Sequence, residues 1–353
     1  MKAAVLHAIG DLRTEEIAKP VPGPGEVLIR IGACGVCGSD IPRVFTKGTY
    51  SFPTVPGHEF AGRIEAAGEG ADPALVGRKA AVFPLIPCFE CPSCEIGEYA
   101  QCENYDYMGS RRDGAFAEYI CAPVWNVLPA PDHLTYEELA MTEPAAVAVH
   151  ALRQAGIDIG DKVFISGAGP IGIMLATWAK AWGASRIILA DIDPQKLEFA
   201  NKLGFADTVN AREEDAAEAV RRITGRGADV AIEGAGSAAS WETCLRAART
   251  SGRVVLMGNP AGDMKLSQNG YWEILRKQLT LKGTWNSAYA DLPKNEWKLV
   301  LESMASGLID LKPLTTHRVS LDELTEAMVM MRDRSAFYNK VMYVNAMEED
   351  GQQ

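Results

Sequence analysis

Short apolar runs separated by turn residues make up the first part of the chain. Residues 1–35 contain several such runs, and the run at 26–31 has the composition of a β-strand after the rigid turn at 20–25. The segment around Cys37 leaves this strand as a loop or a short helix, and a second strand-like run occupies 60–68. This part of the chain is therefore predicted to be mainly β.

From about residue 161 the pattern becomes a regular alternation of buried strands and helices. An apolar helix runs from the glycine-rich turn at 167–172 through Trp182. Strands are predicted at 162–166, 186–190, 229–233, 252–257 and 279–283. Such alternation is typical of a doubly wound parallel sheet, so the predicted fold class is α/β.

The alternation stops near Thr284, and the remaining residues return to a mixed pattern. The elements predicted there are helices near 296–305 and 321–331 and a closing strand at 340–344. We therefore predict a Rossmann domain at 151–285, inserted between two portions of a second domain, 1–150 and 286–353.

Composition and charge narrow the class of protein. The 353 residues suffice for two domains, and the net charge of −11 argues against a nucleic-acid-binding surface. No run of about 18 apolar residues is present, and the N-terminus lacks the apolar core of a signal peptide. The spacing of the eight cysteines is typical of metal binding rather than of disulfides, which favours a cytoplasmic protein. Together with the net charge and the lack of a long apolar run, this predicts a protein that binds neither membrane nor nucleic acid.

The glycine-rich turn after the first strand of the α/β region has the spacing of a dinucleotide-binding fingerprint. Gly167 allows the tight turn, Gly169 lets the backbone approach a pyrophosphate, and Gly172 lets the helix pack closely on the strand. The N-terminus of the helix then faces the phosphates. The pattern is specific here because it follows a strand, opens a helix and has an acidic residue, Asp191, about 20 residues further on.

Asp191 determines which dinucleotide is expected. Its carboxylate would accept hydrogen bonds from a ribose diol and repel a 2′-phosphate, and residues 192–194 supply no arginine for that phosphate. The sequence therefore predicts NAD rather than NADP. The candidate cofactor-binding residues are Gly167, Gly169, Pro170, Ile171, Gly172, Asp191 and Lys196.

A group of four cysteines in one loop can surround a single ion tetrahedrally. Its members are Cys88, Cys91, Cys94 and Cys102. Four thiolates exceed the charge of Zn²⁺ and leave no open position, so this lobe, at about 84–105, is predicted to hold a structural zinc. An iron–sulfur cluster would need a companion motif that is missing, and the acidic loop residues argue against a nucleic-acid-binding zinc ribbon. Cys121 and Cys244 stand alone and are expected in the core.

A second cluster of metal-ligand residue types lies earlier in the chain. Cys37, His58 and Glu59 bring together a thiolate, an imidazole and a carboxylate, and Glu143 is the natural fourth member. One thiolate, one neutral imidazole and one carboxylate balance the charge of Zn²⁺, so a substrate alkoxide would be strongly stabilised there. One alternative is that Cys37 and His58 are ordinary buried residues. Another is that Cys34 and Cys37 form a thiol-redox motif, but no thioredoxin-like pattern of strand and helix surrounds them.

Together these motifs resemble the zinc-containing medium-chain dehydrogenase/reductase family over essentially the whole chain. The resemblance rests on Gly57-His58-Glu59 with its following glycines, the four-cysteine lobe and the dinucleotide fingerprint. It implies a mainly β, GroES-like catalytic domain around the Rossmann domain, two zinc ions per subunit, NAD, and a homodimer or homotetramer. The chain is most similar to the polyol (sorbitol-type) branch, in which the third zinc ligand is a glutamate, here Glu143.

The resemblance also implies a mechanism. The ligands of the catalytic zinc would be Cys37, His58 and Glu143, with Glu59 bound directly or lying behind them. The substrate hydroxyl would bind the zinc and lose a proton, which Ser39 relays, and hydride would pass to the nicotinamide. Asp40 would orient His58. Pro42 stands where many relatives carry a histidine for the next proton transfer.

The same resemblance implies a polyol or polyol phosphate as the substrate. To bind a phosphate group, an acidic protein needs local positive charge. Arg111 and Arg112 are the first candidates for this role, and Arg43 and Lys47 are the second. Alternatively, the arginine pair joins the zinc lobe to the core. Another secondary alcohol, such as a diol, an amino alcohol or a bulkier hydrophobic alcohol, is the second hypothesis. A catalytically silent family member would be expected to have lost ligand residues, and here they are all present.

Overall fold

The computed structural model describes residues 1–345, which form two compact units. One unit comprises Met1–Glu143 and the segment from Ala288 onward, and the other comprises Pro144–Ser287. The predicted boundaries follow residues 150 and 285. In the structure, the first boundary falls near the start of helix α4 (Thr142–Ala155) and the second follows Ser287.

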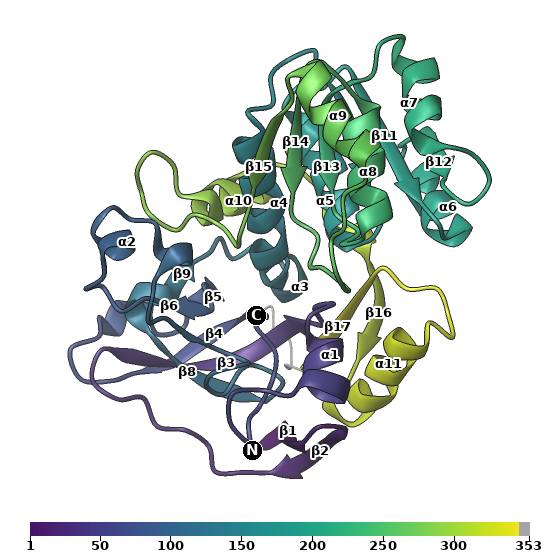
Figure 1. The fold of residues 1–353 in the computed structure, drawn as a ribbon. Helices are drawn as coiled ribbons and strands as arrows, with labels where there is room; N and C mark the ends of the chain where they lie inside the picture. The colour runs from purple at the N-terminus through teal and green to yellow at the C-terminus, as the bar shows by residue number, and fades with distance from the viewer. Residues whose placement is uncertain (346–353) are drawn as a thin grey trace. The chain divides into compact units, whose positions relative to one another are not determined.

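The unit Pro144–Ser287 contains a six-stranded sheet with the strand order β12-β11-β10-β13-β14-β15 (Figure 1). All neighbouring strands in it are parallel. The strands are β10 (Lys162–Ser166), β11 (Arg186–Asp191), β12 (Asp207–Asn210), β13 (Ala228–Glu233), β14 (Ala248–Leu256) and β15 (Thr280–Gly283). Counted along the unit, the order is 3-2-1-4-5-6, which defines a Rossmann fold. The predicted α/β fold class is confirmed.

Helices connect these parallel strands and pack against the sheet (Figure 1). They are α5 (Pro170–Ala181), α6 (Pro194–Lys202), α7 (Ala216–Thr224), α8 (Ala238–Ala247) and α9 (Gln268–Lys277), whereas α4 precedes the first strand, β10. Several begin where a polar side chain accepts a hydrogen bond from the first turn, as Asp193, Asp215 and Ser237 do. Within residues 1–345, every helix is too short or too polar to cross a lipid bilayer.

The other unit is built on a seven-stranded sheet that contains strands from both ends of the chain (Figure 1). Its order is β16-β17-β3-β4-β5-β9, and β8 also pairs with β3. The strands are β3 (Glu26–Gly35), β4 (Glu59–Ala67), β5 (Lys79–Val82), β8 (Tyr119–Pro123), β9 (Val127–Pro129), β16 (Thr315–Val319) and β17 (Lys340–Val344). Because β17 pairs with β3, the closing segment of the chain is placed beside the residues that follow β3.

Shorter elements complete this unit. Two small antiparallel sheets pair β1 (Lys2–Ala8) with β2 (Asp11–Glu16) and β6 (Leu85–Ile86) with β7 (Asp106–Tyr107). The helices are α1 (Asp40–Pro42), α2 (Pro92–Glu95), α3 (Tyr136–Ala140), α10 (Glu296–Ala305) and α11 (Leu321–Asp333). The predicted helix at 296–305 and the predicted strand at 340–344 coincide with α10 and β17.

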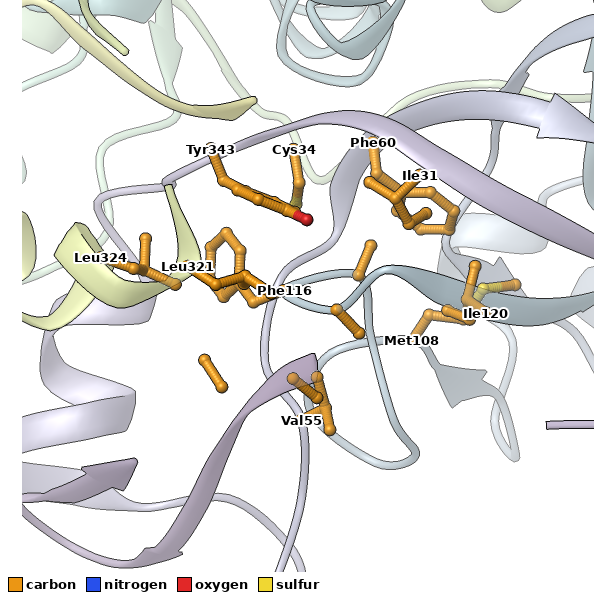
Figure 2. Packing of buried hydrophobic residues seen from close by; sticks show 14 of the residues in the cluster. Ile31, Cys34, Val55, Phe60, Met108, Phe116, Ile120, Leu321, Leu324 and Tyr343 are labelled. Atoms are coloured by element: carbon orange, nitrogen blue, oxygen red, sulfur yellow. The ribbon is translucent and has the colours of Figure 1, made fainter. Parts of the chain in front are cut away.

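The apolar core of this unit is assembled from segments far apart in the sequence. Figure 2 shows Phe116, Leu321 and Tyr343 contributing to one packed cluster from the loop before β8, from α11 and from β17. Tyr343 and Phe116 are almost completely buried. Burying side chains of this size removes enough apolar surface from water to hold α11 and β17 on the sheet. The strand ends that carry the candidate site are therefore fixed by a continuous core.

Candidate active site

Two antiparallel strands bring the first metal-ligand cluster together. Cys37 follows the end of β3, and Glu59 opens β4, where it is the register partner of Gly35. One ligand atom each from Cys37, His58 and Glu59 lies within 4.8 Å of the other two. His58 and Glu59 are buried, and Cys37 is half-buried. The structure thus gathers a sulfur, an imidazole nitrogen and a carboxylate oxygen around one point.

The turn before His58 requires glycine. Gly57 has a φ of +98°, and a Cβ there would lie 2.9 Å from the backbone nitrogen of Phe116 and 3.0 Å from Cys34 Sγ. Only a residue without a side chain fits both this conformation and this close approach. Gly57 therefore sets the direction in which His58 leaves the turn.

Asp40, which the sequence suggested as the residue that orients His58, lies beside the imidazole ring. It is completely buried, its Oδ2 accepts a hydrogen bond from the backbone nitrogen of Cys37 at 3.0 Å, and its Oδ1 lies 3.5 Å from His58 Nδ1. Burial opposes the ionised form of Asp40, but His58 and Arg43 outweigh it and lower the pKa of Asp40. An ionised Asp40 beside Nδ1 leaves the other ring nitrogen of His58 available to a metal.

Lys340 is a member of this site that the sequence pattern does not reveal. Its Nζ forms an ion pair with Glu59 Oε2 and donates a hydrogen bond to the Val36 carbonyl at 3.3 Å. Burial disfavours the charged ammonium, yet the neighbouring Glu59 carboxylate raises the pKa of Lys340. In the sequence Lys340 is simply the first residue of a predicted strand, and lysine side chains are mostly exposed in proteins. Only the pairing of β17 with β3 brings it to Glu59.

Glu143 lies close to the cluster but is not part of the three-residue group. It is in the first turn of α4, is buried, and its Oε1 accepts a hydrogen bond from the Tyr107 hydroxyl at 3.5 Å. The Tyr107 ring centre is 5.7 Å from that of His58. Burial raises the pKa of Glu143 to about 7, and the nearby charges of His58 and Lys340 only partly oppose this effect.

This donor set fits Zn²⁺. Lys340 already balances the charge of Glu59, so a Cys37 thiolate and the Glu143 carboxylate are the two negative charges left for a divalent ion. Buried carboxylates without a counter-ion are unfavourable, and a cation beside Glu143 would relieve that cost. Cysteine sulfur, histidine nitrogen and carboxylate oxygen are also the ligand types of catalytic zinc sites.

The four-cysteine lobe has the geometry of a tetrahedral metal site. The Sγ–Sγ distances are 3.4 Å for Cys88–Cys102, 3.5 Å for Cys91–Cys94 and 4.0 Å for Cys88–Cys94. Four sulfurs bound to one zinc would lie about 3.8 Å apart, given Zn–S distances of about 2.3 Å. The backbone nitrogen of Cys88 also approaches Cys102 Sγ at 3.2 Å, as expected around a thiolate. Of the two remaining cysteines predicted in the core, Cys244 is fully buried and Cys121 is half-buried.

The dinucleotide fingerprint folds as a strand, turn and helix within the Rossmann unit. Gly167 follows β10 with a φ of +113°, and a Cβ on Gly172 would overlap the Gly167 carbonyl oxygen. At the end of β11, Asp191 accepts hydrogen bonds from the backbone nitrogens of Ala168 at 2.8 Å and Asp193 at 3.0 Å. These bonds hold the carboxylate against the glycine-rich turn.

The remaining predicted residues separate into different environments. Ser39 lies beside Cys37, since its backbone nitrogen is 3.5 Å from Cys37 Sγ. Arg43 is engaged with Asp40. Lys47 is exposed. Arg112 is exposed. Its guanidinium nitrogens lie 3.6 Å from a carboxylate oxygen of Asp106 and 3.9 Å from one of Glu26, so it connects β7, which follows the cysteine lobe, to β3.

Arg111 has a different environment from its neighbour. Its guanidinium carbon lies 4.4 Å from the ring centre of Tyr50 and 4.2 Å from that of Tyr105. Its Nε is buried without a hydrogen-bond partner, and no carboxylate within residues 1–345 pairs with it. The ring of Tyr105 is in turn 6.3 Å from that of Tyr107, which neighbours His58. A line of aromatic side chains thus connects Arg111 to the metal-ligand cluster.

Comparison with known proteins identifies the family. Residues 23–132 match the model of the alcohol dehydrogenase GroES-like domain, and residues 170–306 match that of the zinc-binding dehydrogenase domain. The chain therefore belongs to the zinc-binding, medium-chain family of alcohol dehydrogenases. The family resemblance that was inferred from the sequence motifs is confirmed. The prediction that the protein is a dehydrogenase is confirmed as well.

Individual relatives cover nearly the whole chain. Galactitol 1-phosphate 5-dehydrogenase from Escherichia coli is 35% identical over 98% of this chain and 100% of its own length. Sorbitol dehydrogenase from Bacillus subtilis is 36% identical over 93% of this chain and 92% of its own. L-threonine 3-dehydrogenase from Rhizobium etli is 31% identical over 90% and 91%, respectively.

Solved structures agree with these relatives. The crystal structure of galactitol-1-phosphate dehydrogenase from Escherichia coli matches with a TM-score of 0.92 at 35% identity, over 98% of this chain and 100% of that one. A zinc-binding dehydrogenase from Sinorhizobium meliloti bound to NADP has a TM-score of 0.90 at 28% identity, over 98% and 99%. An alcohol dehydrogenase from Escherichia coli with NADH has a TM-score of 0.89 at 27% identity, over 98% and 99%.

Proposed function

We propose that this protein is an NAD-dependent zinc dehydrogenase that interconverts a secondary hydroxyl of a polyol, or of a polyol phosphate, and the corresponding ketone. The observation that carries the proposal is the buried convergence of Cys37, His58 and Glu59, with Glu143 beside them. The relatives named galactitol 1-phosphate 5-dehydrogenase and sorbitol dehydrogenase support the polyol class. In the forward direction the alcohol loses a hydride to NAD⁺ and a proton to the protein.

The residues of the chain would perform distinct parts of this reaction. Zinc held by Cys37, His58 and Glu143 would act as a Lewis acid that lowers the pKa of the substrate hydroxyl. Asp40, whose Oδ1 lies 3.5 Å from His58 Nδ1, would orient the imidazole of His58. We expect the hydroxyl of Ser39, two residues after Cys37, to accept the proton of the substrate hydroxyl, and Pro42 offers no group to pass it further.

Asp191 supports NAD over NADP. Its carboxylate is fixed at the end of β11 by two backbone nitrogens, so it would meet the adenosine ribose with a negative charge. A 2′-phosphate would be repelled there, although Lys196 Nζ, 3.9 Å from Asp191 Oδ2, offsets part of that charge. We therefore expect NADP⁺ to be the weaker substrate.

A panel of alcohols tests the proposed function. Galactitol 1-phosphate, galactitol, sorbitol, 2,3-butanediol and L-threonine are each incubated with the zinc-loaded protein and NAD⁺ or NADP⁺, and reduced cofactor is followed by absorbance. The proposal expects the highest kcat/KM for a polyol or its phosphate with NAD⁺. The relatives named L-threonine 3-dehydrogenase favour an amino alcohol as the second candidate, and L-threonine as the best substrate would establish it instead.

We expect Arg111 to recognise the phosphate if the substrate carries one. Its guanidinium has no acidic partner within residues 1–345, and the rings of Tyr105 and Tyr107 lead from it toward His58. A hydrogen bond to a charged group contributes about 1.5–3 kcal/mol. Arg111→Ala should therefore raise KM for galactitol 1-phosphate about tenfold to a hundredfold and leave KM for galactitol nearly unchanged.

Arg112 provides the matched control for this measurement. Since its guanidinium already faces Asp106 and Glu26, Arg112→Ala should change KM for both substrates by less than about twofold. Equal losses for the phosphorylated and unphosphorylated polyol in the Arg111 variant would contradict the phosphate assignment and leave the dehydrogenase assignment intact.

We also propose that the protein is a homo-oligomer that associates through the Rossmann unit. Strand β15 is at the edge of its sheet, and α9 exposes Tyr271, Trp272 and Leu275 to 54%, 43% and 48%. An unpaired strand edge beside large exposed apolar side chains is typical of a surface covered by a second copy. The double variant Trp272→Glu and Leu275→Glu should lower the mass measured by sedimentation to that of one chain.

A matched control separates this surface from apolar exposure in general. Leu308→Glu changes a side chain that is 55% exposed in the other unit, and it should leave the oligomer intact. A parent protein that sediments as a single chain would exclude the oligomer outright.

A further inference from the structure

A pocket outside the metal and nucleotide sites lies in the unit that contains the cysteine lobe. Its volume is about 620 Å³, and its walls come from the lobe, from β9 and its flanks, from the loop before α10 and from α10 itself. The lining side chains that the argument uses are Tyr99, Trp125, Tyr289, Asp291, Lys298 and Glu302. None of the candidate metal, cofactor or substrate residues is among those that line it.

The aromatic wall of this pocket is held rigidly. The Trp125 ring centre is 5.0 Å from that of Tyr99 and 4.8 Å from that of Tyr289. Behind them, Phe83 stacks on Tyr289 at 4.3 Å with an interplanar angle of 5°. The Tyr289 hydroxyl donates a hydrogen bond to the Trp125 carbonyl at 3.1 Å. The pocket is therefore lined by aromatic rings that are already fixed in place and need little reorganisation when a ligand binds.

The charges at the rim favour a cation. Asp291 and Lys298 are paired at 2.6 Å and balance each other. Glu302 is exposed and forms no ion pair with any residue among 1–345, so its carboxylate is the uncompensated charge. Leu301, Glu302 and Ala305 belong to the last two turns of α10, the end of a helix that carries partial negative charge.

We propose that this pocket binds an organic cation with an apolar or aromatic body. Aromatic faces attract a cation through their quadrupole, and a carboxylate and a helix C-terminus beside them add to that attraction. A pocket of this size suits a small molecule rather than a protein segment. The same features disfavour an organic anion of equal size, so the sign of the ligand's charge is the discriminating property.

The experiment uses the full-length protein and two fluorescent dyes of opposite charge. Thioflavin T is an aromatic cation, and 1-anilinonaphthalene-8-sulfonate is an aromatic anion of similar size. The proposal expects saturable 1:1 binding of thioflavin T. Ala305→Phe, which fills the pocket from α10, and Glu302→Lys, which reverses the rim charge, should each weaken it at least about tenfold.

Glu326→Lys on α11 is the control, since it makes the same charge change on an exposed residue outside the pocket. It should leave thioflavin T binding within about twofold of the parent. Absence of saturable thioflavin T binding, binding that Ala305→Phe does not affect, or equal affinity for the anionic dye would each overturn the proposal.

Discussion

Cys37→Ser is expected to lower kcat/KM on the order of a thousandfold and to reduce the zinc content from two ions per chain to one. Serine is a poor zinc ligand at neutral pH, so the Lewis acid that the cluster would hold is lost. That contribution amounts to several kcal/mol, and each 1.36 kcal/mol corresponds to a factor of about ten in rate. The four-cysteine lobe shares no residue with the cluster and should keep its ion.

The measurement combines initial rates with metal analysis of the purified variant. Cys121→Ser is the control, because this half-buried thiol on β8 belongs to neither cysteine cluster. The control should retain two zinc ions and nearly full activity. A Cys37→Ser protein that kept both ions and its turnover would refute the assignment of the catalytic metal.

Lys340→Met should destabilise the metal-free protein by about 3–5 kcal/mol. The substitution leaves the Glu59 carboxylate buried without its cation, and removing one partner of a buried ion pair has a cost of that size. Because a zinc ion near Glu59 would replace some of the missing positive charge, the loss should be smaller in the zinc-loaded protein.

Urea unfolding of chelator-treated and zinc-loaded protein checks this expectation. The double variant Lys340→Met and Glu59→Gln removes both charges and should recover most of the stability lost in the single variant. If single and double variants unfolded at the same urea concentration, the ion pair would have no role in holding β17 to the site.

The elements that carry the local motifs were predictable because their signals lie within a few consecutive residues. The buried strand at 162–166, its glycine-rich turn and the helix after it follow from apolar runs and from glycines that no side chain could replace. The helix at 296–305 begins where Asn295 caps it, and its residues have helical periodicity. In such segments the information that selects the structure is local.

The two arginines proposed from the sequence as candidates for phosphate binding show where local information ends. Arg111 and Arg112 are adjacent in sequence and equivalent in charge, and the sequence favoured neither. The fold turns one between two tyrosine rings and the other toward Asp106 and Glu26. Only the packing of residues from different segments distinguishes them.

By itself the sequence determined the chemistry that depends on spacing: the four-cysteine lobe, the dinucleotide turn with Asp191, and the pairing of Cys37 with His58-Glu59. The tertiary structure decided which charges those residues meet. Lys340 reaches Glu59 across a separation of 281 residues. Glu143, by contrast, is buried beside Tyr107 and takes part in none of the ion pairs found among residues 1–345. The reason is physical: residue spacing defines what a turn or a strand can present. Electrostatic balance at a buried site depends on every charge within a few ångströms, and strand order brings those charges from distant parts of the chain.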